Sequence, residues 1–550
     1  TKEPPMRTFS SYGPVDKDLH FHVPRTDQVQ AIQNRLVGDP PEKGGHYITV
    51  WAPRQRGKTW IMREVLWTLE ADDRFHAVKL NLEDLQAETD LGRVVAAISQ
   101  KIARRIGISS EPANPGLGPL QQFGELFLRD RVQKPLILML DEFDALPEPV
   151  ISGLVSVFRN LFIQRSEDRA DAFQKEYLLH GVALIGVRNV LGVENVKGSP
   201  FNVQRSVHIP NLTREEVGSI FQWYQEESGQ PVEPAVVDRL FDETLGQPGL
   251  VSWFGELLTE GYEGYAPDRN RPIQEADWER VLQDAVDSLP NNHVLNLIGK
   301  ADREPYRETL LGLFRTGRKT EFSFDDPRLN FLYLNGVIDG ERSNGRMVCR
   351  FSCPFIQARL FNYFSQRLFH ALDEIHDPLA DIDAILQAPE LDVPALMELY
   401  QNYLSKNRHW LLKDAPRRRS DLRVYEAVFH FNLYMFLKRF FLDKGGIVFP
   451  EFPTGNGKVD ILIRFRDRTC ALELKSFQDR YAYTRALKQA AAYGNQLGLE
   501  RIYLILFIDG IDAENRRTLE AVYAEAESGV RVQPIFVQTG NGALHSPGEG

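Results

Sequence analysis

The sequence predicts an α/β protein with several domains and two separate sheets. Short apolar runs alternate with helical patterns from about residue 47 to residue 210, which is typical of a parallel sheet with crossover helices. Two further apolar runs, at residues 458–465 and 468–475, are separated by two residues and predict a hairpin in a second sheet. A length of 550 residues is enough for roughly three or four domains.

The composition is that of a soluble globular protein. Hydrophobic residues make up 43% of the chain and charged residues 26%, and no apolar run is long enough to span a membrane. Residues 1–5 lack the apolar core of a signal peptide, so we expect a cytoplasmic protein. The net charge of −11 excludes a wholly basic surface but leaves room for local basic patches. The three cysteines lack further ligands at zinc-finger spacing, which favours reduced thiols.

The first sheet follows a lead-in segment that contains one predicted helix, at residues 26–36. Each predicted strand is a short apolar run that ends in polar or turn-forming residues. The predicted strands of this sheet are residues 47–51, 76–80, 136–140, 182–187 and 207–209.

A phosphate-binding loop follows the first predicted strand. Ala52-Pro-Arg-Gln-Arg-Gly57-Lys58-Thr59 fits the pattern G-x-x-x-x-G-K-[ST], except that Ala52 replaces the first glycine. A loop of this kind directs backbone N–H groups at phosphates from a helix N-terminus. We expect Gly57 to allow close approach of the backbone, Lys58 to contact the β- and γ-phosphates, and the Thr59 hydroxyl to ligate Mg²⁺.

Two adjacent carboxylates end the third predicted strand, Leu136-Ile-Leu-Met-Leu140. We expect Asp141 to hold Mg²⁺, directly or through water, and Glu142 to polarise the water that attacks the γ-phosphate. The alternative is a core strand that ends in two solvated acids. The presence of this strand after a phosphate-binding loop favours the nucleotide site.

These motifs, in this order, resemble the AAA-like and STAND-type P-loop ATPases of bacteria and archaea, which include archaeal-ATPase-like proteins. The resemblance covers about residues 15–364 and implies ATP as the ligand. It also implies that Arg25 lies near the nucleotide base and that Gly246-Gln247-Pro248 matches the Gly-x-Pro of the helical lid. Ala52 departs from the family pattern.

Two weaker assignments belong to the same site. By the resemblance, a polar residue after the fourth strand senses the γ-phosphate, and Asn189 is our choice, with Arg188 as the rival. Arg205, just before the fifth predicted strand, is a candidate arginine finger that acts on a neighbouring subunit. A solvated surface arginine is the alternative.

The second predicted sheet carries a different set of charges. If Arg466 and Asp467 form the turn, Asp460 lies directly opposite Glu473 on one face of the sheet. Lys475 follows Glu473 by two residues and therefore points the same way. Two carboxylates with an ammonium group suit phosphodiester hydrolysis with one or two Mg²⁺ or Mn²⁺ ions. The alternative is a solvated hairpin with an ordinary salt bridge.

The pattern D-x(12)-E-x-K resembles the PD-(D/E)xK nucleases, over about residues 417–540. By this resemblance, Glu426 in a predicted helix at residues 421–438 matches the acidic helix residue of the family and joins Asp460 and Glu473 as a metal ligand. Gln489-Ala-Ala-Ala-Tyr493 matches the Q-x-x-x-Y helix of the RecB-like branch, in which Gln489 and Tyr493 face the site. A binding-only version of the fold is an open alternative.

The predicted organisation follows from these patterns. Thr213 and Glu216 predict a capping box at the start of the lid, and a hairpin around residues 343–345 indicates a winged helix. Prolines 378, 389 and 394 are expected to break a helical connector. The predicted parts are an ATPase core with its lead-in at 1–210, a helical lid at 211–290, a winged-helix domain at 291–364, the connector at 365–416, a nuclease domain at 417–540 and a disordered tail at 541–550.

The function expected from these features is an ATP-regulated, metal-dependent endo- or exonuclease that acts on nucleic acid, with DNA as the first choice. Two basic clusters are candidate phosphate contacts, although surface solubility is the alternative for each: Arg315, Arg318 and Lys319, and Arg417 to Arg419. We also expect homo-oligomers on ATP binding and no membrane. By analogy alone, such an arrangement fits defence against phage or mobile elements. The second hypothesis is a STAND-like switch in which ATP drives assembly and the nuclease fold is an effector or binding module.

Overall fold

The structure is a computed structural model that describes most of the chain. The described residues are 6–13, 15–186, 205–261, 264–314, 320–343, 345–369, 382–387, 391–413, 415–416, 426–453 and 458–540. Arg188, Asn189, the two basic clusters and the predicted tail at 541–550 lie outside these residues. For Arg205 and Glu426 the backbone is described but the side chain is not.

The chain divides into two compact units, which we describe separately. The first comprises Thr1–Phe241, Leu245–Trp278 and Leu334–Gly336, and the second comprises Asp242–Thr244, Glu279–Tyr333 and Val337–Gly550.

The first unit is built on a five-stranded parallel sheet with the order β2-β3-β4-β1-β5. Its strands are β1 (Tyr47–Trp51), β2 (His76–Asn81), β3 (Leu136–Asp141), β4 (Leu179–Gly186) and β5 (Arg205–His208). The helices of the sheet layers are α1 (Thr26–Val37), α2 (Lys58–Glu70), α3 (Leu91–Ile106), α4 (Pro119–Glu125), α5 (Arg129–Val132) and α6 (Glu148–Glu167), and the helices that follow the sheet are α7 (Arg214–Ser228), α8 (Pro234–Thr244) and α9 (Pro248–Thr259). The last residues of α8 and most of α10 (Glu275–Asp287) belong to the second unit.

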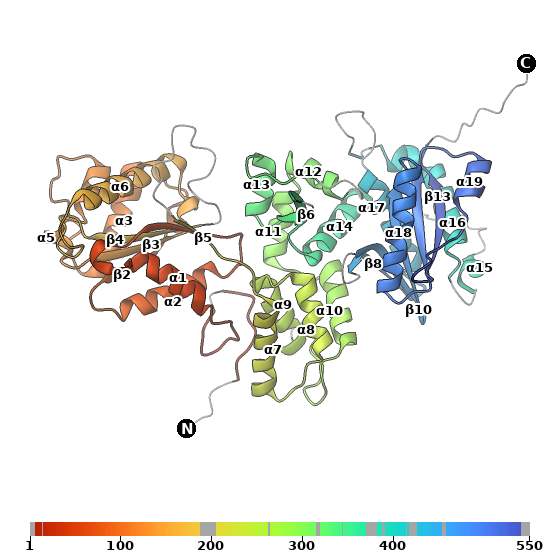
Figure 1. Ribbon diagram of the computed structural model, residues 1–550, viewed down its shortest axis with the longest axis horizontal. Coiled ribbons are helices and arrows are strands. Elements are labelled where there is room, and N and C mark those ends of the chain that lie inside the picture. The colour runs from red at the N-terminus through yellow and green to blue at the C-terminus, as the bar shows by residue number, and fades with distance from the viewer. Residues whose placement is uncertain are drawn as a thin grey trace, which may run out of the picture. The chain divides into compact units, whose positions relative to one another are not determined.

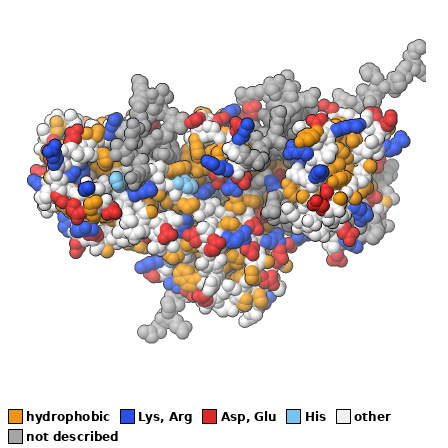
Figure 2. Space-filling model, viewed as in Figure 1, with side chains coloured by type: hydrophobic (Ala, Val, Ile, Leu, Met, Phe, Trp, Pro, Cys, Tyr) orange, Lys and Arg blue, Asp and Glu red, His pale blue; other side chains and the backbone are white. Residues whose placement is uncertain are grey.

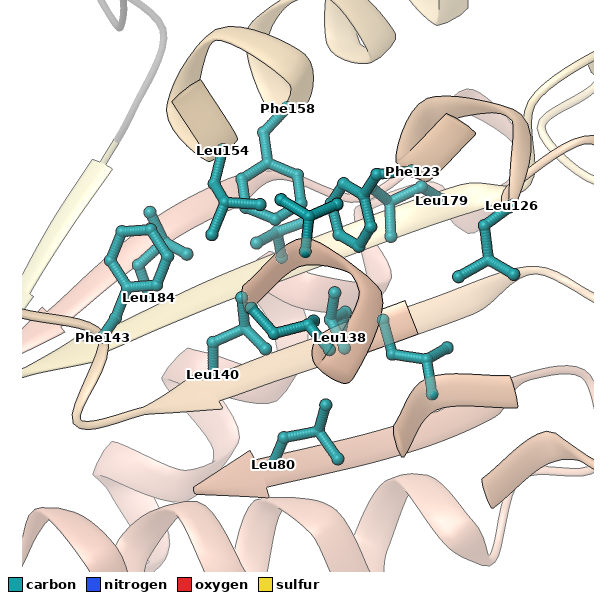
Figure 3. Packing of buried hydrophobic residues seen from close by; sticks show 14 of the residues in the cluster. Leu80, Phe123, Leu126, Leu138, Leu140, Phe143, Leu154, Phe158, Leu179 and Leu184 are labelled. Atoms are coloured by element: carbon teal, nitrogen blue, oxygen red, sulfur yellow. The ribbon is translucent and has the colours of Figure 1, made fainter. Parts of the chain in front are cut away.

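Helices cover both faces of this sheet (Figure 1). Helices α1 and α2 pack on one face, with α3, α4 and α6 on the other. Figure 3 shows how Phe123 and Phe158 from the helices meet Leu138 and Leu140 of β3. Every residue of β3 is buried, as expected for a central strand of a parallel sheet. The carboxyl ends of the strands therefore meet at one edge, where β1 leads into the phosphate-binding loop and β3 ends in Asp141.

The second unit contains a two-stranded sheet and a six-stranded mixed sheet. Its strands are β6 (Ile338–Ser343), β7 (Arg346–Phe351), β8 (Gly446–Pro453), β9 (Lys458–Phe465), β10 (Arg468–Ser476), β11 (Arg501–Ile508), β12 (Tyr523–Ala524) and β13 (Arg531–Gln538). Its helices are α11 (Asn292–Ala301), α12 (Tyr306–Leu313), α13 (Pro327–Leu334), α14 (Pro354–Phe369), α15 (Ile382–Gln387), α16 (Val393–Leu411), α17 (Glu426–Phe441), α18 (Arg480–Gln496) and α19 (Ala513–Leu519).

The mixed sheet has the order β12-β13-β11-β10-β9-β8. Strands β8, β9 and β10 are antiparallel to one another, whereas β10, β11 and β13 run parallel. Helix α18 packs on one face through a cluster that includes Leu487, Ala490 and Leu504. Helix α17 packs on the opposite face, where Phe429 stacks on Phe507. Because side chains alternate between faces along each strand, the face covered by α18 carries Asp460, Glu473 and Lys475.

Most predicted elements are confirmed, with shifts at their ends. Strand β4 begins at Leu179 rather than residue 182, and β5 runs from Arg205 to His208 rather than 207–209. Arg205 is therefore the first residue of β5, not a residue before it. The Thr213 and Glu216 capping box is present, and β9 and β10 form the predicted hairpin.

The helical connector differs more from its prediction. Pro394 is the second residue of α16 and does not break it, because proline is tolerated in the first turn, where the missing N–H has no helical partner. Helix α14 continues to Phe369, so the predicted boundary at residue 364 falls inside a helix. Within the described residues, none of the helices is both long and apolar enough to cross a lipid bilayer.

Candidate functional sites

The phosphate-binding loop has the backbone that its sequence predicts. Gly57 precedes α2 with a φ of 82°, a left-handed conformation that favours glycine. Lys58 is buried, and its Nζ donates hydrogen bonds to the carbonyl oxygens of Ala52 (2.8 Å) and Pro53 (3.1 Å). Thr59 is exposed in the first turn of α2. An ammonium group and a hydroxyl group thus flank the helix N-terminus, where a phosphate is favoured.

Acidic side chains surround Lys58. Burial lowers the pKa of Lys58 to about 8, although the charges of Glu142, Asp144 and Asp141 oppose the shift. Burial also raises the pKa of Glu142, and the neighbouring Asp141 and Asp144 raise it further. The structure therefore brings Lys58, Asp141 and Glu142 together as predicted.

Asp141 has partners of its own. It is 2% exposed, and its Oδ2 lies 2.5 Å from Lys79 Nζ on the neighbouring strand β2. Its Oδ1 accepts a hydrogen bond from the backbone N–H of Glu142 (3.1 Å), and Glu142 itself has a left-handed φ of 54°. The sequence reasoning missed Lys79 and Asp144. The Asp-Glu-Phe-Asp144 run is the signal that points to Asp144.

The predicted lid motif lies against the phosphate-binding loop. The N–H of Gly249, next to Gly246-Gln247-Pro248, donates to the carbonyl oxygen of Gln55 (3.3 Å). A Cβ atom on Gly249 would come within 2.2 Å of the Gln55 side chain, so only glycine fits there without rearrangement. The N-terminus of α9 therefore packs directly against the loop.

Arg25 is buried between two elements of the first unit. Its Nε lies 3.2 Å from Glu216 Oε1 in α7, and its guanidinium donates to the carbonyl oxygen of Pro210. These contacts connect the start of α1 to α7. Proximity of Arg25 to a nucleotide base stays a prediction, as do the roles of Asn189 and Arg205.

In the second unit, the hairpin has the predicted register. Leu472 pairs with Ile461 and Arg468 pairs with Phe465, so Glu473 follows directly opposite Asp460. Glu473 is 1% exposed and Asp460 is 5% exposed. Lys475 Nζ lies 2.5 Å from Glu473 Oε1, and Asp460 Oδ2 accepts a hydrogen bond from the backbone N–H of Leu474 (2.6 Å).

The charges in this hairpin influence one another strongly. Burial raises the pKa of Glu473 to about 8, and the negative charge of Asp460 adds to the shift. Burial alone would lower the pKa of Lys475, but the charges of Glu473 and Asp460 raise it above its ordinary value. Perturbed pKa values of this kind are typical of functional sites, although structural ion pairs also produce them.

The predicted Gln489 and Tyr493 lie one turn apart on α18. Gln489 Nε2 donates to the Tyr493 hydroxyl (2.7 Å). Burial raises the pKa of Tyr493, which also senses the charges of Glu473, Lys475 and Asp460. Tyr493 therefore lies near enough to the carboxylates to be affected by their charge, whereas Gln489 is exposed and contacts Tyr493.

The residues fit a divalent cation in two respects. Asp460 and Glu473 supply the carboxylate oxygens that Mg²⁺ and Mn²⁺ prefer, and Glu473 Oε2 is buried without a hydrogen-bond partner among the described residues. As the side chains stand, no group of three or more His, Cys, Asp or Glu residues in the described part of the chain is arranged to hold a metal ion. The predicted third ligand, Glu426, has an undescribed side chain.

Comparison with known proteins identifies the N-terminal part. Residues 11–260 match a family model described as an AAA-like domain. This part of the chain is therefore an AAA-like P-loop domain, and it carries the nucleotide-binding motifs described above. No curated protein matches the sequence.

Several solved structures show a distant likeness. The Orc1 protein of Aeropyrum pernix in complex with DNA is 16% identical, over 63% of this chain and 95% of that chain, with a TM-score of 0.33. A Walker-type ATPase of Pyrococcus abyssi is 15% identical, over 64% and 99%, with a TM-score of 0.37. The RuvB Holliday junction branch migration motor of Thermotoga maritima is 14% identical, over 59% and 92%, with a TM-score of 0.32. These likenesses are too distant to carry an argument about function.

Proposed function

We propose that the chain is an ATP-regulated, metal-dependent nuclease, with DNA as its substrate. The observation that carries this proposal is the pair of buried carboxylates, Asp460 and Glu473, directly opposite each other beside Lys475. Burying two carboxylates so close together is unfavourable unless cations compensate them. A site that holds a divalent cation provides that compensation.

In this proposal Asp460 and Glu473 hold the cation. When bound, the cation lowers the pKa of a coordinated water and neutralises charge at the scissile phosphate. Lys475 orients the attacking water or contacts a phosphate oxygen once Glu473 engages the cation. Tyr493 and Gln489 line the same face of the sheet and position the phosphate backbone.

The AAA-like domain binds the regulatory ligand. In this proposal Lys58 and Thr59 contact the phosphates of ATP and its Mg²⁺, and Asp141, at the end of β3, holds the same Mg²⁺. An ATP-dependent restraint would protect the cell from uncontrolled cleavage of its own DNA. A role in defence against phage or mobile elements fits such a nuclease, and it is a proposal by analogy.

The test is cleavage of linear, circular and single-stranded DNA and of RNA, with Mg²⁺ or Mn²⁺, with and without ATP. We expect Asp460→Asn and Glu473→Gln to lose cleavage by about 1,000-fold or more, because each removes several kcal/mol of transition-state stabilisation. Asp467→Asn is the matched control, because Asp467 lies exposed in the turn of the same hairpin. Cleavage that persists in chelator, or in Glu473→Gln, would falsify the metal mechanism.

A second candidate is the STAND-like switch, in which this domain binds a partner and does not cleave. One observation favours it: Lys475 already neutralises Glu473, and Lys458 pairs with the nearby Glu451. The hairpin therefore has internal cations that reduce its need for a metal. ATP-dependent assembly by a wild-type chain that cleaves none of the four substrates would favour this candidate.

A further inference from the structure

The exposed side of α18 combines positive charge with an aromatic ring. Tyr481, Arg485 and Lys488 follow one another at spacings of four and three residues, so they lie on one side of the helix, and all three are exposed. The opposite side, which includes Leu487 and Ala490, packs on the mixed sheet. The 17 residues of α18 contain no Asp or Glu, although the net charge of the chain is −11. We call Tyr481, Arg485 and Lys488 the α18 strip.

No acid of the described residues forms an ion pair with Arg485 or Lys488. Two like charges three residues apart slightly destabilise a helix, so the pair does not serve the stability of α18. Asp479 is the nearest acid in the sequence, but it is the N-cap of α18 and accepts a hydrogen bond from the backbone N–H of Ala482 (2.7 Å). A helix surface of one sign, in a chain that is acidic as a whole, favours an anionic ligand.

Tyr481 indicates which anionic ligand the strip fits. The residue is 73% exposed, and the Arg485 guanidinium lies 6.0 Å from the centroid of its ring. Proteins that bind single-stranded nucleic acid combine cations that follow the phosphates with aromatic rings on which unpaired bases stack. In a duplex the faces of the bases are already covered by the neighbouring base pairs. An acidic peptide would use the two cations without needing the ring.

The α18 strip also lies on the helix that borders the proposed nuclease site. Four residues separate Lys475 from the start of α18, and the charges of Glu473 and Asp460 affect Tyr493 further along the helix. At 1.5 Å per residue, α18 extends about 18 Å from Tyr481 to Tyr493, enough for a short run of nucleotides. Figure 1 shows α18 on the viewer's side of the mixed sheet.

We propose that the α18 strip binds single-stranded DNA, with Arg485 and Lys488 on phosphates and Tyr481 stacked on an unpaired base. The inference deepens the proposed function, because it names the class of substrate, and it rests on that function only for the direction of the strand, toward Tyr493 and the carboxylates. A duplex would have to open, or present a single-stranded end, before a strand could follow this path.

The test is binding of the full chain to a labelled oligo(dT) of about 16 nucleotides, the upper site size of one single-strand-binding fold. Fluorescence anisotropy in chelator measures binding without metal-dependent cleavage. Arg485→Gln and Lys488→Gln should each reduce the slope of log K against log salt concentration by about 0.7. Tyr481→Ala should weaken binding about tenfold, whereas Tyr481→Phe keeps the ring and should bind like the wild type. Arg531→Gln is the matched control, because Arg531 is a cation of β13 that pairs with Glu500.

A cross-link locates the bound strand, because other parts of the full chain could also hold DNA. Oligo(dT) that carries 4-thiothymidine should cross-link to α18 under ultraviolet light, within a turn of Tyr481. The double variant with Arg485→Gln and Lys488→Gln should lose this cross-link. Circular dichroism of each variant should match the wild type, because the three side chains are exposed.

Three results would overturn the inference. The first is wild-type affinity and salt dependence in the double variant, and the second is cross-links confined to elements other than α18. The third is displacement of oligo(dT) by polyglutamate of equal charge in the wild type and in Tyr481→Ala alike, which would indicate an acidic protein partner instead.

Cleavage assays separate the inference from the proposed function. If the chain cleaves DNA, the strip variants should raise KM and leave kcat unchanged, because they remove binding that is equal in the ground state and the transition state. Wild-type binding and cleavage by these variants would overturn the inference and leave the proposed function standing. Binding through the strip by a wild-type chain that cleaves no DNA would support the inference and overturn the proposed nuclease.

Discussion

At the nucleotide site, individual side chains have different tasks because their surroundings differ. Lys58 Nζ donates hydrogen bonds to the carbonyl oxygens of Ala52 and Pro53 in this structure. A phosphate that binds Lys58 would have to replace these oxygens as hydrogen-bond acceptors. Glu142 has a raised pKa because it is buried beside Asp141 and Asp144. A carboxylate of raised basicity is suited to polarise a water molecule.

The first prediction follows from this division of tasks. Lys58→Ala should abolish ATP hydrolysis and weaken ATP binding, because it removes the ammonium group expected on the β- and γ-phosphates. Glu142→Gln should keep binding and lose turnover by about 100-fold or more, the usual contribution of a general base. Hydrolysis and nucleotide titrations measure the two effects. Glu148→Gln, an exposed acid nearby, is the control, and wild-type hydrolysis by Glu142→Gln would refute the role of Glu142.

At the level of elements, the hairpin of β9 and β10 could be predicted in full because its turn has two residues. A turn of two residues fixes the register, and the register alone places Asp460 opposite Glu473. Strands β1 and β3 were equally predictable, because each apolar run leads directly into a motif: the phosphate-binding loop after β1, and Asp141 and Glu142 at the end of β3.

The strand beside this hairpin, β8, was only partly predictable. Glu451 lies between Pro450 and Pro453, and prolines argue against a strand because they cannot donate a hydrogen bond to the ladder. The structure accommodates them because β8 is the edge strand of the sheet. The Glu451 carboxylate accepts a hydrogen bond from Gln357 of α14, which lies 94 residues away in the sequence, and no local pattern points to this partner. Local patterns thus identify the hairpin but not the elements that a distant part of the chain brings to it.

The second prediction tests the packing of α18, which carries Gln489 and Tyr493. A Cβ atom on Gly494 would come within 2.8 Å of Val530 Cγ1, and Val530 is itself buried and stiff. We expect Gly494→Ala to destabilise the second unit by about 1–3 kcal/mol, the usual cost of overpacking. Gly312→Ala in α12 meets no atom within 4 Å and should stabilise by about 0.5–1 kcal/mol.

Calorimetric unfolding compares the two alanine variants with the wild type, and hydrogen exchange of α18 localises the change. If Gly494→Ala is as stable as Gly312→Ala, then α18 does not lie as close to Val530 as the structure has it.

For the whole molecule, the question is how a nucleotide in one part affects the chemistry of another. The face seen in Figure 2 mixes Lys and Arg with Asp and Glu, in keeping with the net charge of −11. Charge on this face therefore does not point to a surface that would connect the two parts. A ligand shifts an equilibrium only through its different affinity for two states. ATP must therefore bind one arrangement of the molecule, or one state of assembly, more tightly than another.

Assembly through Arg205 provides such a difference. Arg205 begins β5, the strand next to β1, and β1 leads into the phosphate-binding loop. If this arginine contacts the γ-phosphate held by a neighbouring subunit, ATP stabilises the assembled state and ADP does not, because the contact needs the γ-phosphate. The assembled state would then bring several nuclease domains to one DNA molecule.

The last prediction is that particle size depends on nucleotide. Mass photometry with a non-hydrolysable ATP analogue should show larger particles than ADP does, and Lys58→Ala should stay at the size of the ADP state. Arg205→Ala should bind ATP as a single chain but lose hydrolysis by about 1,000-fold, the lower range for an arginine finger. Arg214→Ala is a suitable control because Arg214 of α7 forms an ion pair with Asp238 of α8. If the particles have one size with either nucleotide and DNA is cleaved equally in both, ATP does not regulate the proposed nuclease.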